Sequence, residues 1–306
     1  MNARRSLIKG LAGAGVWIMT QNIRAQQPTA SGTIRRAIPS SGELLPVIGL
    51  GTYQAFDVGE DASARAQLKR VLRELVAKGG SVVDSSPMYG RAEGAVGDLS
   101  GELDLRPSLF LATKVWTSGK EAGIRQMEES LRLMRTQAMD LMQIHNLVDW
   151  RTHTATLKEW KQNGRVRYIG ITHYHSGAYD ELERLIKTRE YDFVQLNYSI
   201  AEREAERSIL PLAQQMGVAV IANRPFAQSS LFSRVRGKAV PPWATDFDCT
   251  TWAQFFLKYI VSHPAVTCAI PATNKPEHMA DNMGAGYGRL PDQPTRQKMA
   301  GVVDSL

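Results

Sequence analysis

One short run, Met139-Asp140-Leu141-Met142-Gln143-Ile144-His145, is mostly apolar and ends on a histidine. Further runs of this kind recur along the chain, and the segments between them carry apolar residues at helical spacing. Continuous apolar runs are typical of parallel strands, because both faces of a parallel sheet are covered. The other candidate strands are residues 46–50, 81–84, 109–114, 166–172, 193–198, 218–223 and 267–272.

The first intervening segment shows the helical pattern well. Leu68, Val71 and Leu72 belong to one apolar face, Asp61 is a candidate N-cap, and Gly79 with the next glycine is a stop signal. Similar patterns predict helices around residues 124–134, 182–186 and 255–260. Strands that alternate with helices, without a linker between them, predict an α/β fold of the eight-stranded (β/α)8 TIM-barrel type.

An N-terminal β-hairpin is expected before the first barrel strand. Residues 33–36 and 43–45 flank the turn sequence Pro39-Ser40-Ser41-Gly42, and this hairpin is predicted to close the barrel floor. The chain has 306 residues, of which 43% are hydrophobic and 22% charged. Because α/β barrels commonly run to about 250 residues, residues 26–306 are expected to form a single domain.

The positive charge of the chain is concentrated at its N-terminus. The net charge is +7, and Arg4, Arg5, Lys9 and Arg24 supply four of these charges, with no acid among residues 1–25. The remainder is close to neutral, and no basic run is interleaved with aromatic residues. This pattern argues against a nucleic-acid partner.

Residues 1–25 have the pattern of a signal peptide. The run Arg4-Arg5-Ser6-Leu7-Ile8-Lys9 is similar to the twin-arginine export signal, and residues 7–20 are weakly apolar. A Sec signal and an amphipathic first helix are the alternatives. The apolar stretch is shorter than the roughly 20 residues of a membrane span. We therefore expect export by the twin-arginine route, cleavage after Ala25 and a periplasmic mature protein without a stable membrane span.

Neither the cysteines nor the histidines form a recognisable structural site. Cys249 and Cys268 do not make a disulfide framework, and Cys268 is expected to be a small buried hydrophobe. His173 and His175 alternate along a strand, so their rings are expected to point apart, and no further ligand joins them at metal-binding spacing. No metal site is predicted.

Polar side chains stand where the candidate strands end. Active sites of (β/α)8 barrels are built at the C-terminal ends of the strands, so these positions are the first candidates for chemistry. Titratable groups follow several successive strands, which a chance arrangement does not readily explain. The strand-end positions are Asp84, Lys114, His145, Thr172, His173, Gln195, Asn223, Arg224, Thr273 and Asn274, with Tyr89 five residues after Asp84.

Several of these segments resemble the aldo-keto reductase superfamily. They are residues 49–54 (GLGTYQ), 83–90 (VDSSPMYG), 112–114 (ATK), 139–145 (MDLMQIH) and 195–198 (QLNY), and the resemblance runs in order from about Ile34 to Asn282. The resemblance implies an eight-stranded barrel that binds a nicotinamide cofactor without a glycine-rich fingerprint. No convincing G-x-G-x-x-G is present in the sequence.

Residue by residue, the resemblance makes Asp84, Tyr89, Lys114 and His145 the catalytic tetrad. Tyr89 is then the general acid that protonates the oxygen of the reduced carbonyl. Because a free tyrosine has a pKa of about 10, Lys114 is expected to lower the pKa of Tyr89, while Asp84 keeps Lys114 charged and oriented. His145 is expected to hydrogen-bond the carbonyl oxygen and to aim the carbonyl carbon at the nicotinamide.

The positions expected to hold the cofactor match the family less completely. Thr172-His173 stands where the family has a Ser-Asn pair, Asn223-Arg224 where many members place a stacking Tyr, and Ala272 where many have a Lys. Donors near a helix N-terminus still suit a 2′-phosphate, which favours NADP over NAD. The expected cofactor-binding residues are Thr52, Tyr53, Thr172, His173, Gln195, Asn223, Arg224, Thr273, Asn274, Lys275, His278 and Asn282.

The sequence thus predicts an NADP-dependent oxidoreductase that reduces aldehydes or ketones to alcohols. Tyr53, Phe56, Trp116 and Trp150 follow strand ends and are expected to line an open apolar pocket for a small carbonyl substrate. A periplasmic location further implies that a second substrate or a redox partner recycles the cofactor. The alternative is a catalytically silent periplasmic barrel that retains a nicotinamide or a small apolar ligand.

Overall fold

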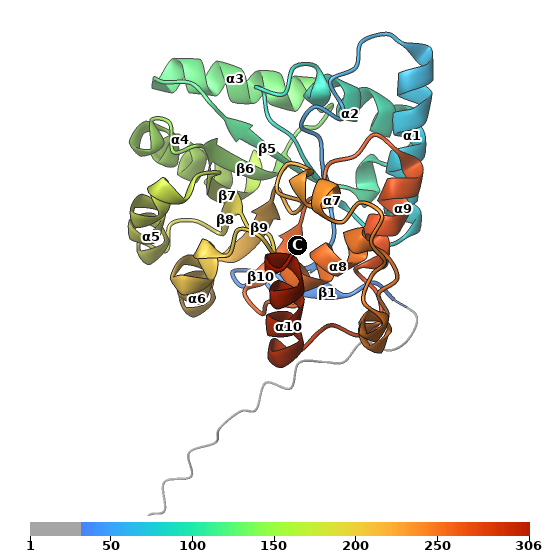
Figure 1. Cartoon of the computed structure of the whole chain (residues 1–306). Helices are drawn as coiled ribbons and strands as arrows, with labels where there is room; N and C mark the ends of the chain where they lie inside the picture. The colour runs from blue at the N-terminus through green and yellow to red at the C-terminus, as the bar shows by residue number, and fades with distance from the viewer. Residues whose placement is uncertain (1–31) are drawn as a thin grey trace, which may run out of the picture.

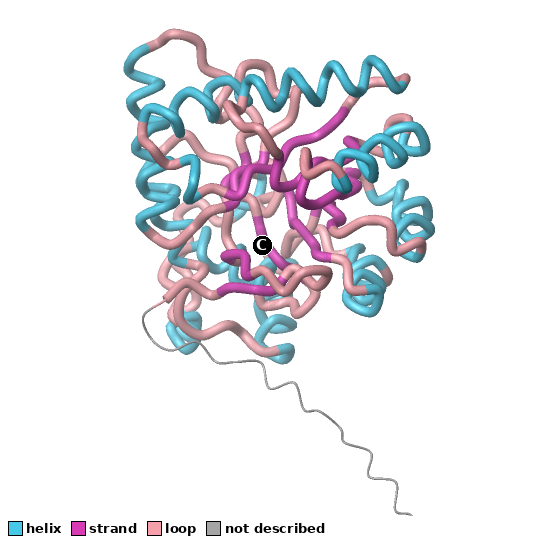
Figure 2. Tube along the Cα trace, turned by 180° about the vertical axis from the view of Figure 1, so that it is seen from behind, coloured by secondary structure: helices cyan, strands magenta, loops and turns pink. Residues whose placement is uncertain are grey.

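The computed structural model of the chain describes residues 32–306. The predicted signal peptide therefore lies outside the described residues. Parallel strands stand at the centre of the described part and helices surround them (Figures 1 and 2). The strands are β3 (Leu50–Gly51), β4 (Val82–Asp84), β5 (Phe110–Val115), β6 (Met139–His145), β7 (Val166–His173), β8 (Phe193–Asn197), β9 (Ala219–Asn223) and β10 (Val266–Ala269).

Neighbouring strands along the chain are also neighbours in the sheet, in the order β3 to β10. Parallel bridges from Ile48 to Ala269 and from Gly51 to Ala272 bring the first strand beside the last. The eight-stranded (β/α)8 barrel is therefore confirmed. Its helices are α1 (Ala62–Ala77), α2 (Ala92–Glu102), α3 (Lys120–Leu133), α4 (Trp150–Gln162), α5 (Tyr179–Lys187), α6 (Ile209–Met216), α7 (Ser230–Arg234), α8 (Trp252–Val261), α9 (Pro276–Gly284) and α10 (Gln293–Asp304).

The predicted hairpin is present and closes one end of the barrel. Strands β1 (Arg35–Ala37) and β2 (Leu44–Pro46) pair antiparallel. Two hairpin residues, Ile38 and Leu45, are buried and belong to the apolar cluster inside the barrel. From the strands this cluster takes Val82, Phe110, Ala112, Leu141, Tyr168, Phe193, Ala219, Ile221, Cys268 and Ile270.

The side chains that point into the barrel are apolar near the hairpin and polar at the C-terminal ends of the strands. We call this polar end the mouth of the barrel. Phe110 belongs to the interior cluster, and Lys114 stands four residues later on the same strand face. In the same way, Leu141 is followed at two-residue spacing by Gln143 and His145. Because all the barrel strands are parallel, their C-terminal polar residues meet at one end.

The first barrel strand is shorter than predicted. The sequence indicates a strand over residues 46–50, whereas Pro46 belongs to the hairpin and β3 comprises only Leu50–Gly51. The backbone at Gly49 passes so close to Val82 that a Cβ on Gly49 would lie 2.8 Å from the Val82 Cβ. Backbone bonds to Ala269 nevertheless continue the barrel through Val47 and Gly49.

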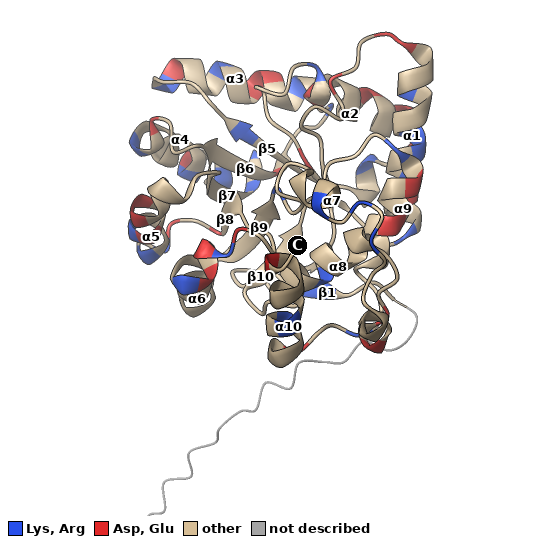
Figure 3. Ribbon diagram, in the orientation of Figure 1, with Lys and Arg blue, Asp and Glu red and all other residues tan. Residues whose placement is uncertain are grey.

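Within residues 32–306 the structure also bears on a helix cap, the cysteines and the distribution of charge. The Asp61 side chain accepts hydrogen bonds from the first turn of α1, as its role as N-cap requires. Both cysteines are free and buried. No described helix is long and apolar enough to cross a membrane. Acidic and basic residues are intermixed along α3 and α5 (Figure 3), which agrees with the absence of a basic run in the sequence.

Candidate active site

A buried ion pair occupies the centre of the polar mouth. The Lys114 ammonium donates to Asp84 Oδ2 at 2.6 Å and to the Ser85 carbonyl at 2.6 Å. Lys114 is 1% exposed and Asp84 is 2% exposed. Burial alone lowers the pKa of Lys114, but the negative charge of Asp84 and the proximity of Tyr89 outweigh it and raise the pKa above its usual value. Lys114 is therefore held as a cation.

Tyr89 stands on the turn after β4, beside this pair. The Lys114 Nζ atom lies 5.3 Å from the centre of the Tyr89 ring. Burial raises the pKa of Tyr89 above its usual value, and the positive charge of Lys114 offsets only part of this effect. Lys114 therefore lowers the pKa of Tyr89 as predicted, but removal of the phenol from water raises this pKa by more, so the net shift is upward.

His145 ends β6 and faces the same space. Its ring lies 6.1 Å from the Tyr89 ring, nearly perpendicular to it at 85°, and its Nδ1 atom is 3.0 Å from Ser86 Oγ. Burial lowers the pKa of His145 to about 3, with further contributions from the charges of Lys114 and His173. The imidazole is therefore neutral near pH 7. The structure thus brings all four predicted catalytic residues together.

Two supporting residues were not singled out from the sequence. Gln143 Nε2 donates to Asp84 Oδ1 at 3.1 Å, and Ser86 contacts His145 as described above. Gln143 lies two residues before His145 and pairs in register with Lys114. Its position on the same face of β6 as His145 is the sequence signal that identifies it, because side chains two residues apart on a strand point the same way.

Unsatisfied polar atoms mark the ends of β8 and β9. The side-chain amide of Gln195 is buried, and neither its nitrogen nor its oxygen has a hydrogen-bond partner. The side-chain oxygen of Asn223 is likewise buried without a partner. Thr172 is buried on β7 and pairs in register with both His145 and Gln195. A buried amide without partners is suited to a ligand that also carries an amide.

Three side chains at the C-terminal ends of β7 and β9 form a stack beside these residues: His173 is the last residue of β7, Tyr174 follows it, and Arg224 follows β9. The His173 and Tyr174 rings are parallel, 5.5 Å apart and 8° from coplanar, and the Arg224 guanidinium lies 4.4 Å from the centre of the Tyr174 ring. His173 Nδ1 accepts from the backbone N–H of His175 at 3.1 Å. Burial lowers the pKa of His173.

The predicted adenosine-binding residues cluster at the start of α9. Thr273 Oγ1 accepts from the backbone N–H of Lys275, and the Asn274 carbonyl accepts from Gln67 Nε2 at 2.7 Å. Asn282 is buried further along the helix, whereas His278 is exposed. The loop and the helix start therefore have a fixed shape, and their exposed side chains remain available to a ligand.

The residues expected to line a substrate pocket separate into two groups. Tyr53 contacts Tyr89 edge to face with ring centres 5.0 Å apart, and the exposed Trp116 lies 6.1 Å from His145. Phe56 is completely buried in the hydrophobic core, so its prediction as a pocket residue is wrong. Trp150 packs against the same core and carries Arg151 over its ring.

Thr52, which the resemblance assigns to the cofactor, is also completely buried. Its hydroxyl donates to the Asp84 carbonyl at 3.0 Å and lies 3.0 Å from Ser85 Oγ. Thr52 therefore supports the end of β4 behind the Asp84 carboxylate.

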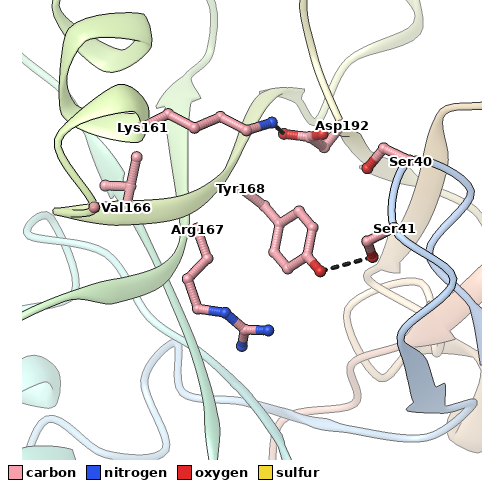
Figure 4. Close-up of a pocket in the computed structure, with 8 residues that line it drawn as sticks. Ser40, Ser41, Lys161, Val166, Arg167, Tyr168 and Asp192 are labelled. Atoms are coloured by element: carbon pink, nitrogen blue, oxygen red, sulfur yellow. Dashed lines mark hydrogen bonds and ion pairs between the residues drawn. The ribbon is translucent and has the colours of Figure 1, made fainter.

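A separate hollow of about 490 Å³ lies at the opposite end of the barrel. Figure 4 shows its lining, which includes the hairpin serines Ser40 and Ser41, with Tyr168 Oη donating to Ser41 Oγ. Its basic side chains are paired, because Lys161 contacts Asp192 at 2.6 Å and Arg167 contacts Asp140 at 2.8 Å. The basic side chains of this hollow are therefore neutralised by acidic partners.

Fold and site together define a (β/α)8-barrel protein with an Asp–Tyr–Lys–His cluster at its C-terminal mouth. The sequence matches the model of the aldo/keto reductase family over residues 47–297. The chain therefore belongs to the aldo/keto reductase family.

Individual relatives agree with this assignment. The sequence is 30% identical to "Methylglyoxal reductase YeaE" of Escherichia coli (strain K12) over 257 residues, which cover 81% of this chain and 88% of that protein. The structure is similar to an aldo-keto reductase from Klebsiella pneumoniae in complex with NADPH. That match has a TM-score of 0.72 and 26% identity, and it covers 89% of this chain and 95% of the other.

Proposed function

We propose that this protein is an NADP-dependent oxidoreductase that reduces small aldehydes or ketones to alcohols, with Tyr89 as the general acid. The observation that carries the proposal is the buried Lys114–Asp84 pair beside Tyr89, with His145 facing the same space. A carbonyl that gains a hydride develops negative charge on its oxygen, which a positioned acid and a positioned donor relieve. The similarity to the Escherichia coli methylglyoxal reductase supports the reaction, and the similarity to the NADPH complex from Klebsiella pneumoniae supports the cofactor.

The residues at the mouth fit a nicotinamide cofactor. Gln195 offers a buried amide without partners, and Thr172 adds a hydroxyl beside it, which together suit the carboxamide. Thr273, Asn274 and Lys275 precede α9 and suit the adenosine phosphate, Lys275 with its charge. When bound, the nicotinamide supplies the hydride.

The chain's own residues then place and protonate the carbonyl. When Ser86 donates to His145 Nδ1, the proton of the neutral ring sits on Nε2, which is free to donate to the carbonyl oxygen. Tyr89 gives its hydroxyl proton to that oxygen. Lys114 stabilises the phenolate that forms, and Asp84 with Gln143 fixes the position of the ammonium.

The substitution Tyr89→Phe tests the assignment of the acid. We expect kcat for an aldehyde such as methylglyoxal to fall by about 10²–10⁴-fold, because the proton donor is lost while the ring remains. NADPH oxidation measures turnover, and quenching of tryptophan emission measures NADPH binding, which Tyr89→Phe should largely retain. Tyr191→Phe is the matched control, since it removes a buried hydroxyl that contacts Thr154. Full turnover by Tyr89→Phe would refute the role of Tyr89.

We further propose that the chain is exported through the twin-arginine route and works in the periplasm. The support is the sequence of residues 1–25, with its paired Arg4 and Arg5 before a weakly apolar stretch. Replacement of both arginines by lysine should keep the precursor in the cytoplasm, as measured by cell fractionation and by the size of the protein. Unchanged delivery of the shortened protein to the periplasm would contradict the route.

A further inference from the structure

The connection from β5 to α3, residues 116–119, brings an indole ring to the mouth of the barrel. The Trp116 side chain is 41% exposed, and its ring lies 6.1 Å from the ring of His145, the residue proposed to hold the carbonyl oxygen. The Tyr89 ring lies at the same distance from His145. A carbonyl compound that contacts both Tyr89 and His145 therefore has to fit beside the indole.

One side chain of the following helix holds the backbone of Trp116. Gln126 of α3 accepts a hydrogen bond from the Trp116 N–H through Oε1 at 2.5 Å, and its Nε2 atom donates to the Trp116 carbonyl at 3.3 Å. An amide that bonds both backbone groups of one residue fixes the position and the orientation of that residue. Trp116 thus carries an exposed ring on a backbone that is tied to α3.

A buried histidine holds the next residue of this connection. His153 of α4 is completely buried, and its Nε2 atom lies 2.6 Å from the Thr117 carbonyl. Because a carbonyl only accepts, Nε2 carries the proton, and Nδ1 is left buried without a partner among the described residues. The ring fits against α3 because residue 123 is a glycine, since a Cβ on Gly123 would lie 2.4 Å from His153 Cε1.

Asp149 fixes the far end of the connection. Its carboxylate accepts from the Gly119 N–H at 2.8 Å and from the Thr152 hydroxyl at 2.8 Å, and these bonds hold the pKa of Asp149 below its usual value. Gly119 has a backbone φ of 88°, a conformation that glycine adopts without strain. The connection is therefore held at three of its four residues by side chains of α3, of α4 and of the N-cap of α4.

We propose that Gln126 and His153 are positioning residues that keep Trp116 beside His145 and so restrict this reductase to carbonyl compounds without branching next to the carbonyl carbon. This inference rests on the proposed carbonyl reduction. A mobile loop would let the indole withdraw from a branched substituent, whereas a loop held at several backbone groups resists this displacement. A fixed wall of this kind gives specificity by repulsion of the wrong substrate.

Propanal and 2,2-dimethylpropanal differ by two methyl groups next to the carbonyl carbon and test the restriction. We expect the wild-type protein to favour propanal in kcat/KM. The substitution Gln126→Met keeps the length of the side chain and removes both hydrogen bonds, so it should lower this preference by about 10-fold, the low end of the range for one methylene group in a fitted pocket. The intrinsic reactivities of the aldehydes cancel when variants are compared.

Conservative variants separate the hydrogen bonds from packing. Gln126→Glu keeps the acceptor for the Trp116 N–H but loses the donor, so an intermediate preference is expected. His153→Leu should lower the preference, and His153→Gln, whose amide can still donate to Thr117, should retain it. Gln137→Met is the matched control, because Gln137 is exposed and its side chain has no hydrogen bond within residues 32–306. NADPH affinity should be unchanged in all four variants and in the control.

Binding of the matching amides tests the same wall without turnover. Propanamide and 2,2-dimethylpropanamide present a carbonyl that is not reduced, and quenching of tryptophan emission measures their binding to the NADPH-loaded protein. The wild-type protein should bind propanamide more tightly than 2,2-dimethylpropanamide. Gln126→Met should lower the ratio of the two affinities, and Gln137→Met should leave it unchanged.

Each contrary result has a separate meaning. Equal falls in kcat/KM for both aldehydes in Gln126→Met and His153→Leu would overturn the inference, because a loosened site and not a displaced wall would explain them. A lower preference in Trp116→Ala alone would also overturn it, since the indole would then act without this support. Failure of the NADPH-saturated wild-type protein to reduce either aldehyde would refute the proposed function, and the amide affinities would still decide the role of Gln126.

Discussion

At the scale of single residues, the Lys114–Asp84 pair combines its proposed catalytic role with a structural one. Both side chains are almost completely buried, so each charge depends on the other for its solvation. Removal of one partner from a buried pair is far more costly than replacement of both, because the remaining charge is left without compensation. The pair therefore links the stability of the barrel to the chemistry at its mouth.

The substitution Lys114→Met is expected to destabilise the protein by about 3–5 kcal/mol, since Asp84 then stays buried as an unpaired carboxylate. Urea unfolding measures this loss. The double variant Asp84→Asn with Lys114→Met should recover much of the stability, because no charge remains, yet it should stay inactive in NADPH oxidation. If the double variant were as unstable as the single one, the loss would come from packing and not from the unpaired charge.

Candidate site residues could be predicted from the sequence where a polar residue type and a strand end coincide, and the family resemblance added Tyr89. Asp84, Lys114 and His145 satisfy this condition, and the structure brings them together with Tyr89. Gln143 and Ser86 escaped notice because their roles depend on register between strands. Phe56 follows a strand end but turns into the core, and the sequence carries no signal for that direction.

At the scale of elements, Thr251 couples two helices that follow one another around the barrel. Its hydroxyl accepts from the Gln254 backbone N–H at 3.1 Å and so caps α8. The same hydroxyl donates to Asp281 of α9 at 3.0 Å, and Gln254 Nε2 donates to Asp281 at 2.8 Å. Thr251 thus links α8 to the second half of α9, the helix whose start carries the residues proposed for the adenosine phosphate.

Replacement of Thr251 by Ala should lower the free energy of unfolding by about 1–2 kcal/mol, through loss of the N-cap and of the contact with Asp281. Thr251→Ser keeps the hydroxyl and should stay within about 0.5 kcal/mol of the wild type. Urea titrations that follow tryptophan emission measure both values. Similar losses in the Ala and Ser variants would show that the methyl group, and not the cap, is what stabilises this position.

Most elements follow from local pattern, and the exceptions have physical causes. The apolar runs predict the barrel strands because both faces of the sheet are covered, and Asp61 marks the start of α1. Helix α2 contains three glycines, which gives it a weak helical signal. Packing explains one of them, since a Cβ on Gly97 would lie 2.0 Å from the Leu133 carbonyl of α3. Such close approaches between helices are not visible in a single segment.

At the scale of the whole molecule, the barrel buries one histidine at its mouth and partly buries another at its opposite end. His145 is buried at the mouth, and burial lowers its pKa to about 3. His263 lies between α8 and β10, where burial and the charge of Arg296 lower its pKa to about 4. An unfolded chain presents histidines with a pKa of about 6.5. The two states of the protein therefore bind different numbers of protons in mild acid.

This difference predicts how stability depends on pH. Below about pH 6.5 the unfolded chain binds more protons than the folded protein, so acid favours unfolding. Each histidine makes its full contribution to the free energy of unfolding above about pH 6.5. This contribution is lost as the pH falls towards about 4 for His263 and about 3 for His145, with a limiting slope of about 1.4 kcal/mol per pH unit for each group.

Urea unfolding at pH 7, 6 and 5 measures how the free energy of unfolding changes with pH. The substitution His263→Gln should make this slope shallower. The reduction should be smaller than the limiting slope of one histidine, because the His263 ring is partly exposed. His278→Gln removes an exposed histidine and is the matched control, for which the wild-type slope is expected. Equal slopes for His263→Gln and wild type would mean that His263 takes up its proton without unfolding. The acid sensitivity of the barrel would then have to come from other groups, of which His145 is the first candidate.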